Sequence, residues 1–460
     1  MSLELNHLDA TAVLEKFRDG SISPSAYAES VAERAHEFSD LNALQSFDPE
    51  HMVRTADNSF REHPNALLSG LPVVAKDNIN TTNYPTSAGT QALLEKTPAN
   101  NAGVVKNITN AGGFIGAKAG MHELAFGITS NNAVTGPVRN PNNPDMIPGG
   151  SSGGTAAAIA AGIFPAGLGT DTGGSCRIPA ALCGIVGFRP TTGRYDGKGI
   201  VPISHTRDTV GPLARSVRDI VLFDKVLSGD ASHSSSSNIS DFTIGVPRHV
   251  FFDNLDPLVA QAIEKQLINL SSQGAKLVEI SLEPIWAHNE AFSFPVVFYE
   301  VMRDLPAYLA DHAPDITFET LIAGIGSPDV AGAIGSQLGE DAMPEAAYKA
   351  AMDHHRPEMR RIYGRAFEDH GIDAIVFPTT PLTARPIGHD ETVDLNGAQV
   401  PTFPTYIRNT DLGSNIGAPG ISLPCPINSG LPVGIEFDAL PGKDLTLLAL
   451  AGAAEKAMAQ

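Results

Sequence analysis

Short apolar segments alternate with amphipathic segments along most of this chain. Five apolar runs are bounded by turn formers and have the length of buried strands: LPVVAKDNI (71–79), PAGLGTD (165–171), FTIGVP (242–247), IDAIVFPTTP (372–381) and GISLPCP (420–426). Segments of mixed charge with helical spacing separate them, for example at 257–274 and 346–371. Strands interleaved with helices in this way predict an α/β protein whose sheet is covered by helices on both faces.

The first 60 residues predict helices with recognisable starts. Asp9 is expected to cap a helix that ends at Gly20, because a side-chain oxygen at this position can accept a free N–H of the first turn. Ser23 is expected to cap a second helix, with Pro24 in its first position. We expect these helices of residues 1–60 to pack on the rest of the chain.

The middle of the chain contains no obvious boundary between domains. A short strand that leads into a helix is expected over residues 111–127, and a helix of small residues over 155–163. The run SHSSSSN (232–238) consists of polar turn formers, and we interpret it as an exposed loop rather than a linker. The prediction is therefore a single domain over residues 1–460.

Composition excludes several classes of protein. The net charge of −20 argues against a nucleic-acid partner, since such binding depends on lysine and arginine that neutralise phosphates. No apolar run is long enough to span a bilayer, and the first residues lack the pattern of a secretion signal. Three cysteines without a CxxC pair indicate free thiols in a reducing compartment. We therefore expect a cytoplasmic protein without a membrane or nucleic-acid partner.

The segment PGGSSGGT (148–155) places two serines among four glycines. A glycine-rich turn before a helix suggests phosphate binding. The segment nevertheless lacks the lysine of GxxxxGK[ST] and the spacing of GxGxxG. A nucleotide site is therefore disfavoured.

A second glycine-serine element, GTDTGGSCRIP (169–179), follows shortly afterwards. Four backbone N–H groups there could stabilise an oxyanion that forms beside Ser175, namely those of Thr172, Gly173, Gly174 and Ser175 itself. A serine nucleophile needs a base that takes its proton. The nearest histidines in sequence, His122 and His205, are typical of core or surface positions, so a lysine is an alternative base.

These elements together resemble the amidase signature family. The resemblance is carried by LPVVAKDNI, by PGGSSGGTAAAIAAGIFPAGLGTDTGGSCRIPAALCGIVGFRPTTGR and by PVGIEF, and it extends from about residue 60 to the C-terminus in the same order. It implies an α/β fold built on a single large mixed β-sheet with helices on both faces. It also implies an amidohydrolase that needs neither a cofactor nor a metal ion.

The resemblance further implies a Ser–cis-Ser–Lys triad. Ser175 would be the acylated nucleophile, Ser151 the bridging serine with a cis peptide bond before it, and Lys76 the base. Lysine accepts a proton only when it is neutral, and its ordinary pKa is about 10.4. Burial lowers that pKa, and the apolar residues before Lys76 are suited to bury it. We therefore expect activity to rise with pH.

Within the family, segments such as MHELAFGITSNN and IRNTDLGSN are most similar to bacterial indoleacetamide hydrolases, followed by mandelamide hydrolases. This similarity implies a small aryl-acetamide as substrate and ammonia as the leaving amine. Expected contributors to the substrate site, or to the packing around it, are Met121, Ile128, Thr129, Ser152, Trp286, Phe294, Phe298 and Tyr299. The aromatic residues among them fit ordinary core packing equally well.

One alternative function remains from the same resemblance. The family includes the glutaminase-type subunit of tRNA-dependent amidotransferases, which would use glutamine and act only in a complex. The sequence is compatible with a homodimer but does not determine the oligomeric state.

Overall fold

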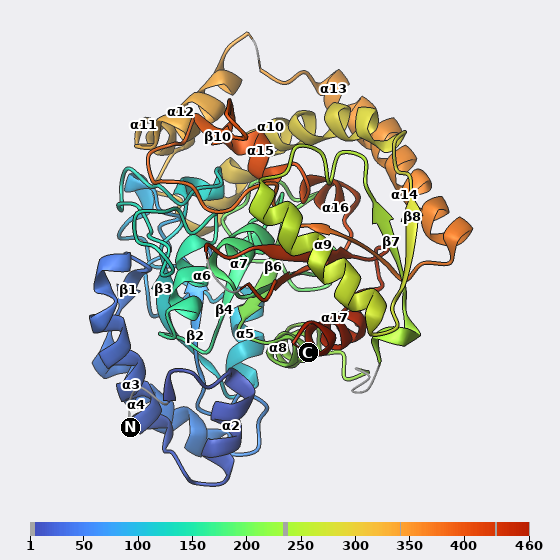
Figure 1. Ribbon diagram of the computed structural model, residues 1–460. Helices are drawn as coiled ribbons and strands as arrows, with labels where there is room; N and C mark the ends of the chain where they lie inside the picture. Colours follow the sequence, from blue (N-terminus) through green and yellow to red (C-terminus); the bar gives the residue numbers. More distant parts are fainter. Residues whose placement is uncertain (1–4, 233–237, 341, 428–429, 460) are drawn as a thin grey trace.

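The computed structural model describes residues 5–232, 238–340, 342–427 and 430–459 (Figure 1). Its centre is an eleven-stranded sheet. In spatial order the strands are β1 (Leu44–Phe47), β3 (Phe114–Ala119), β2 (Pro72–Lys76), β4 (Ala166–Asp171), β6 (Thr209–Ala214), β5 (Val186–Arg189), β12 (Gly420–Pro424), β13 (Gly434–Asp438), β9 (Ala374–Pro378), β7 (Thr243–Pro247) and β8 (Lys276–Ile280). A separate hairpin consists of β10 (Thr392–Leu395) and β11 (Ala398–Pro401).

The large sheet is mixed, as expected. Strand β2 runs parallel to β3 and β4, and β7 runs parallel to β8 and β9. The remaining neighbours, from β4 through β6, β5, β12 and β13 to β9, are antiparallel, as are β1 and β3. Each of the five predicted apolar runs contains one strand of this sheet, because an interior strand buries both of its faces.

Helices surround the sheet (Figure 1). They are α2 (Ala10–Arg18), α3 (Pro24–Glu37), α4 (Pro49–Glu62), α5 (Gly103–Asn110), α6 (Gly153–Ala160), α7 (Arg177–Cys183), α8 (Val217–Ser228), α9 (Pro257–Ser272), α10 (Ile285–His312), α11 (Phe318–Ala323), α12 (Pro328–Gly335), α13 (Glu345–Ala350), α14 (Arg356–His370), α15 (Thr402–Ile407), α16 (Asp411–Ile416) and α17 (Asp444–Met458). Short 3₁₀ turns are η1 (Ser39–Leu41), η2 (Gln91–Leu93), η3 (Glu123–Ala125), η4 (Ile239–Asp241) and η5 (Ser336–Leu338), and η6 (Ala351–His355) is a π-helical turn.

Strand β9 demonstrates that helices cover both faces of the sheet. Its residues Ala374 and Val376 pack in the apolar cluster that contains buried residues of α9 and α17. The intervening Ile375 and Phe377 pack with buried residues of α10, α14 and α16. Alternate side chains of a strand point to opposite faces, so these two clusters are separate helical layers.

The predicted helix starts near the N-terminus are confirmed. The side chain of Asp9 accepts a hydrogen bond from the N–H of Ala12, and that of Ser23 accepts one from Ala26. The helix expected near residue 127 is wrong: only the turn η3 forms there. Leu124 and Ala125 both have positive φ, a conformation incompatible with a continuing α-helix. Residues 233–237 of the predicted serine-rich loop lie outside the described residues.

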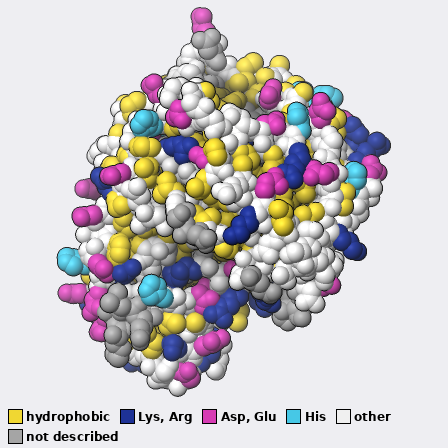
Figure 2. All heavy atoms as spheres, in the orientation of Figure 1, with side chains coloured by type: hydrophobic (Ala, Val, Ile, Leu, Met, Phe, Trp, Pro, Cys, Tyr) yellow, Lys and Arg dark blue, Asp and Glu magenta, His cyan; other side chains and the backbone are white. Residues whose placement is uncertain are grey.

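Acidic and basic side chains are interspersed over the visible face of the molecule rather than gathered into one basic patch (Figure 2). Among the described residues, no helix combines the length and the apolar composition needed to cross a membrane.

Candidate active site

Two parallel strands bring the predicted catalytic elements together. Strand β2 ends at Lys76 and its neighbour β4 ends at Asp171, with Ala75 aligned to Leu168. Because parallel strands end at the same edge of a sheet, Lys76 lies beside the last residues of β4. The loop that contains Ser175 follows directly and leads into α7.

Lys76 is buried completely and contacts Ser151. Its Nζ lies 2.7 Å from Ser151 Oγ and 2.7 Å from Thr170 Oγ1. Burial lowers the pKa of Lys76 to about 7, although nearby negative groups such as Asp171 raise it in part. A large fraction of the amine is therefore neutral near neutral pH, as a proton acceptor requires.

The segment PGGSSGGT wraps closely around the end of the sheet. The peptide bond between Gly150 and Ser151 is cis, the geometry that the resemblance implies. Gly149 has a φ of +82°, which favours glycine. At Gly154 the backbone of other segments is so close that a Cβ atom would lie 2.3 Å from the carbonyl oxygen of Gly120. The glycines therefore permit a close backbone approach around the two serines.

The two adjacent serines have different surroundings. The hydroxyl of Ser152 donates to the carbonyl oxygen of Thr170 at 3.1 Å and accepts from its N–H at 3.3 Å. Ser151 instead faces Lys76. The N–H of Ser152 also donates to the carbonyl oxygen of Ser175 at 3.2 Å, so the two glycine-serine elements are joined directly through their backbones.

A buried ion-pair network holds the loop after β4. Asp171 accepts hydrogen bonds from Arg177 at 3.0 and 3.1 Å and from Arg189 at 3.0 Å. Arg177 also donates to Glu436 on β13 at 2.6 Å. Burial alone would raise the pKa of Asp171, but Arg177 and Arg189 outweigh it and keep that pKa well below its ordinary value. The ionised carboxylate also accepts from the N–H groups of Gly174 and Cys176, and these bonds orient the loop.

These contacts change the set of N–H groups that is available to an oxyanion. The N–H of Gly174 is occupied, because it donates to Asp171 Oδ1 at 2.9 Å. Among the hydrogen bonds between described residues, none uses the N–H of Thr172, Gly173 or Ser175. The N–H of Gly174 is therefore not free to bind an oxyanion, whereas the N–H groups of Thr172, Gly173 and Ser175 are available for it.

Ser175 opens into a cavity of about 220 Å³. Its apolar walls come from the η3 loop, α10, α12 and α15, and its polar lining includes Arg207 and two carboxylates. The lining residues are Ala125, Phe126, Gly127, Ile128, Thr172, Gly173, Ser175, Ile203, Arg207, Ser293, Phe294, Val297, Phe298, Asp329, Ala333, Asp390, Phe403 and Ile407. Ser175 is 7% exposed, whereas Lys76 and Ser151 are completely buried behind it.

The charged groups of the cavity are mostly engaged with other residues. Arg207 pairs with Asp411 and donates to the carbonyl oxygen of Thr172 at 3.1 Å. His122 accepts an N–H bond at Nδ1, so its Nε2 donates to Asp329 at 2.9 Å. Burial alone would raise the pKa of Asp329, but this hydrogen bond lowers it below its ordinary value. The cavity therefore contains an ionised carboxylate and an arginine whose charge is already balanced.

Several predicted pocket residues do not line this cavity. Met121 packs instead against Ala125 and Ile203 in a small apolar cluster. Thr129 donates to Asp390 at 2.7 Å, and Ser152 bonds to the backbone of β4 as described above. Trp286 packs against Phe251, and Tyr299 stacks on Tyr348. Ile128, Phe294 and Phe298 do line the cavity.

Sequence reasoning missed several polar residues of this site, including Arg207 and Ser293 of the cavity lining. Thr170 bonds to Lys76, and its place at the end of a buried strand next to β2 was the available signal. Asp329 and Asp390 come from segments far apart in the chain. No motif or periodicity marks either residue.

In this arrangement a completely buried lysine contacts Ser151, and Ser175 faces a mainly apolar cavity. The amidase family matches residues 27–448, and the chain belongs to this family. An indoleacetamide hydrolase of Rhizobium radiobacter is 44% identical over 448 residues, which cover 97% of this chain and 96% of the relative. A mandelamide hydrolase of Pseudomonas putida is 39% identical and covers 97% of this chain and 90% of its own. A solved amidase superposes with a TM-score of 0.86 at 34% identity, over 98% of this chain and all of that one. The protein is thus an amide hydrolase.

Proposed function

We propose that this enzyme hydrolyses a small, uncharged aryl-acetamide to the carboxylic acid and ammonia, through an acyl-enzyme on Ser175. The observation that carries the proposal is the 2.7 Å contact between Lys76 Nζ and Ser151 Oγ, directly behind the loop that presents Ser175 to the cavity. A buried lysine with a pKa of about 7 can act as a base at neutral pH.

Acylation begins when Ser175 Oγ attacks the amide carbonyl carbon. Its proton passes to Ser151, which gives its own proton to neutral Lys76. The N–H groups of Thr172, Gly173 and Ser175 stabilise the oxyanion, since none of them has another partner among the described residues. The relay then returns the proton to the leaving nitrogen, the C–N bond breaks and ammonia departs.

Deacylation uses the same groups in reverse. Water attacks the ester carbon and gives a proton to the Ser151–Lys76 relay. The bond between the carbon and Ser175 Oγ then breaks, and Ser175 recovers its proton as the acid leaves. The apolar walls around Ser175 limit the access of bulk water and strengthen the electrostatic interactions of the site.

The lining of the cavity supports an aromatic, uncharged acyl group. Phe126, Phe294, Phe298 and Phe403 provide flat apolar surface for an aryl ring. Asp329 and Asp390 offer acceptors for a ring N–H or a hydroxyl, and they oppose a carboxylate on the substrate. The relatives named as indoleacetamide and mandelamide hydrolases agree with this chemistry.

The same lining opposes the alternative of a glutaminase-type subunit. Glutamine carries an α-carboxylate, which would need an uncompensated cation in the cavity. The only cation among the described lining residues is Arg207, and it is already paired with Asp411. We also propose a cytoplasmic location, which the three buried free cysteines support.

The test is ammonia release from indole-3-acetamide, mandelamide, benzamide, malonamate and glutamine. We expect turnover of the two aryl-acetamide-type substrates and little of malonamate or glutamine. Ser175→Ala should abolish turnover, and mass spectrometry of the wild-type enzyme quenched during turnover should find the acyl group on Ser175. Ser152→Ala is the matched control, because its hydroxyl bonds to the backbone of Thr170 and not to Lys76, and it should retain most activity.

Exclusive turnover of glutamine would replace this proposal with the amidotransferase alternative. Rapid turnover of an aliphatic amide alone would contradict the aryl-acetamide assignment but leave the mechanism intact. An acyl group trapped on another side chain would contradict the mechanism.

A further inference from the structure

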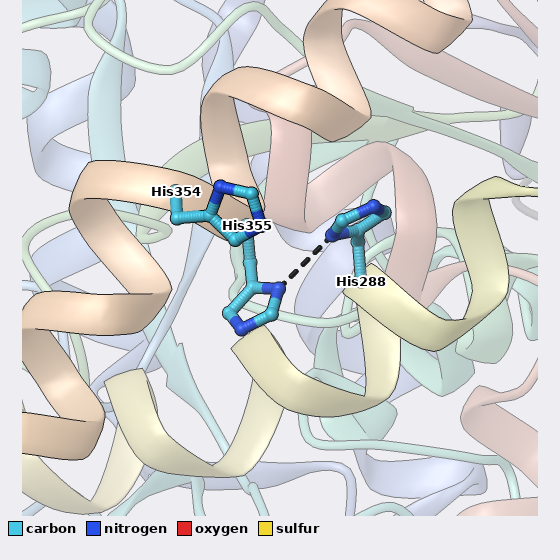
Figure 3. A group of neighbouring side chains, drawn as sticks. All are labelled: His288, His354 and His355. Atoms are coloured by element: carbon cyan, nitrogen blue, oxygen red, sulfur yellow. Dashed lines mark hydrogen bonds between the residues drawn. The ribbon is translucent and has the colours of Figure 1, made fainter.

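Three histidines meet on the side of the molecule where α10 packs against α14. His288 lies in the first turns of α10, while His354 and His355 are adjacent in the π-helical turn η6, immediately before α14 (Figure 3). His288 Nδ1 is 3.0 Å from His355 Nδ1, and one ring nitrogen of each histidine lies within 4.8 Å of the other two. None of the three contributes to the amide-hydrolysing cavity.

Buried neighbours fix the segments that carry these histidines. On α10, Ile285 and Phe292 are completely buried on either side of His288. Ala351 and Met359, on either side of the histidine pair, are also completely buried in the same apolar cluster. The wider turn of a π-helix reduces the angle between successive side chains, so both adjacent histidines can face α10 (Figure 3). The cluster is thus held by the packing of the two helices.

We propose that His288, His354 and His355 bind one divalent transition-metal ion, with Zn²⁺ as the representative ion. Zinc binds imidazole nitrogen at about 2.0–2.1 Å in tetrahedral geometry, which places two ligand nitrogens about 3.3 Å apart. The observed separation of 3.0 Å between His288 and His355 is close to that value. His354 is exposed, so a rotation of its side chain brings in the third nitrogen.

A carboxylate lies beside the cluster. Glu358 follows His354 by four residues, about one turn of helix, and lies near His288 and His354. It pairs with Arg361 at 2.7 Å, so it offers a ligand atom rather than a net negative charge. This carboxylate or a water can occupy the fourth position.

A metal ion at this site would stabilise the fold and would take no part in amide hydrolysis. The ion would join α10 to the continuous segment formed by η6 and α14. Apolar side chains already pack between these two parts of the chain. Helix α10 continues into the cavity wall through Ser293, Phe294, Val297 and Phe298. The inference rests on the histidine geometry alone and is independent of the proposed substrate.

The test is a calorimetric titration of ZnCl₂ into untagged protein after dialysis against EDTA. We expect saturation at one ion per chain and an increase in Tm with bound zinc. His288→Asn and His355→Asn should weaken binding at least about tenfold, since even the loss of an outer-shell partner costs about 10–100-fold in metal affinity. His370→Asn is the matched control, because His370 is exposed on α14 outside the cluster, and it should bind as the wild type does.

The exposed His354→Asn variant provides a check that does not depend on folding, since its side chain is not part of the core. It should weaken zinc binding and alter the visible spectrum of bound Co²⁺, which reports the ligand set. Absence of saturable binding by the wild-type protein would overturn the proposal. Equal affinity of the wild type and all three cluster variants would do so as well.

Discussion

Lys76 combines two properties that an exposed lysine cannot have. Complete burial removes the water that would stabilise its ammonium form and lowers its pKa to about 7, well below the ordinary value for lysine. Two hydroxyl groups at 2.7 Å hold the amine in place whether it is charged or neutral. A small shift in pH near neutrality therefore changes whether it can accept a proton.

The pH dependence of kcat/KM follows from this lysine. Only neutral Lys76 accepts a proton, so kcat/KM should rise about tenfold per pH unit below pH 7 and level off above it. The measurement is initial ammonia release from pH 5 to 9 with an uncharged amide. Lys76→Ala should lower kcat about 10²–10⁴-fold, the usual contribution of a general base. A profile that is flat across neutrality in the wild type would contradict the role of Lys76.

At the scale of elements, the site depends on how closely α6 approaches the neighbouring loops. Gly154, the second residue of this helix, lies against the carbonyl oxygens of Gly120 and Ala43, at 2.3 and 2.6 Å from where a Cβ would lie. Backbone atoms cannot rotate away as the end of a side chain can. The helix start, and with it the position of Ser151, therefore requires glycine here.

Gly154→Ala should consequently lower stability and activity together. Overpacking of this kind costs about 1–3 kcal/mol, more than the gain of up to about 1 kcal/mol from helix propensity. Gly332→Ala in α12 is the matched control, because nothing lies within 4 Å of its added Cβ, and it should leave Tm unchanged or raise it. Tm and kcat/KM of both variants test this. A fully active Gly154→Ala enzyme with unchanged Tm would contradict the packing argument.

The strands of the sheet show which parts of the fold could be predicted from the sequence. Strands β2 and β4 were predictable because buried strands need short apolar runs, and their parallel pairing explains why Lys76 and the Ser175 loop share an edge. The order of the other strands was not predictable, since the antiparallel neighbours β9 and β13 are separated by more than 50 residues of sequence. Periodicity carries no information on such pairing.

The polar residues of the site were also not predictable from the sequence pattern. Asp329 and Asp390 line one cavity although they belong to separate segments of the chain. In the same way, His288 on α10 contacts His355 on η6. Tertiary packing alone creates these groupings. The proposed triad comes only from the resemblance to a family, because no spacing rule connects Lys76 to Ser151.

At the scale of the whole molecule, charge favours release of the proposed product. The chain carries a net charge of −20, and the cavity contains Asp329 and Asp390 beside an arginine that Asp411 already balances. An uncharged amide enters without electrostatic cost, whereas hydrolysis converts it to a carboxylate inside this field. The acid is therefore repelled from the place where it forms.

Inhibition by the product acid tests this repulsion. An aryl-acetate should inhibit weakly, and its inhibition constant should fall as salt is added, because the Debye length shrinks from about 30 Å at 0.01 M to about 8 Å at 0.15 M. KM for the uncharged amide should barely change. Asp390→Asn should strengthen inhibition by about threefold to tenfold, the effect of removing one charge within a few ångströms in a partly aqueous site.

The matched control is Asp311→Asn, an exposed carboxylate on α10 outside the cavity lining. It changes the net charge by the same amount, so equal effects of the two variants would assign the repulsion to the overall charge rather than to the cavity. Inhibition that weakens as salt is added would mean that Arg207 attracts the carboxylate despite its pairing with Asp411. In that case the cavity would also accept anionic amides, and the assignment of an uncharged substrate would be wrong.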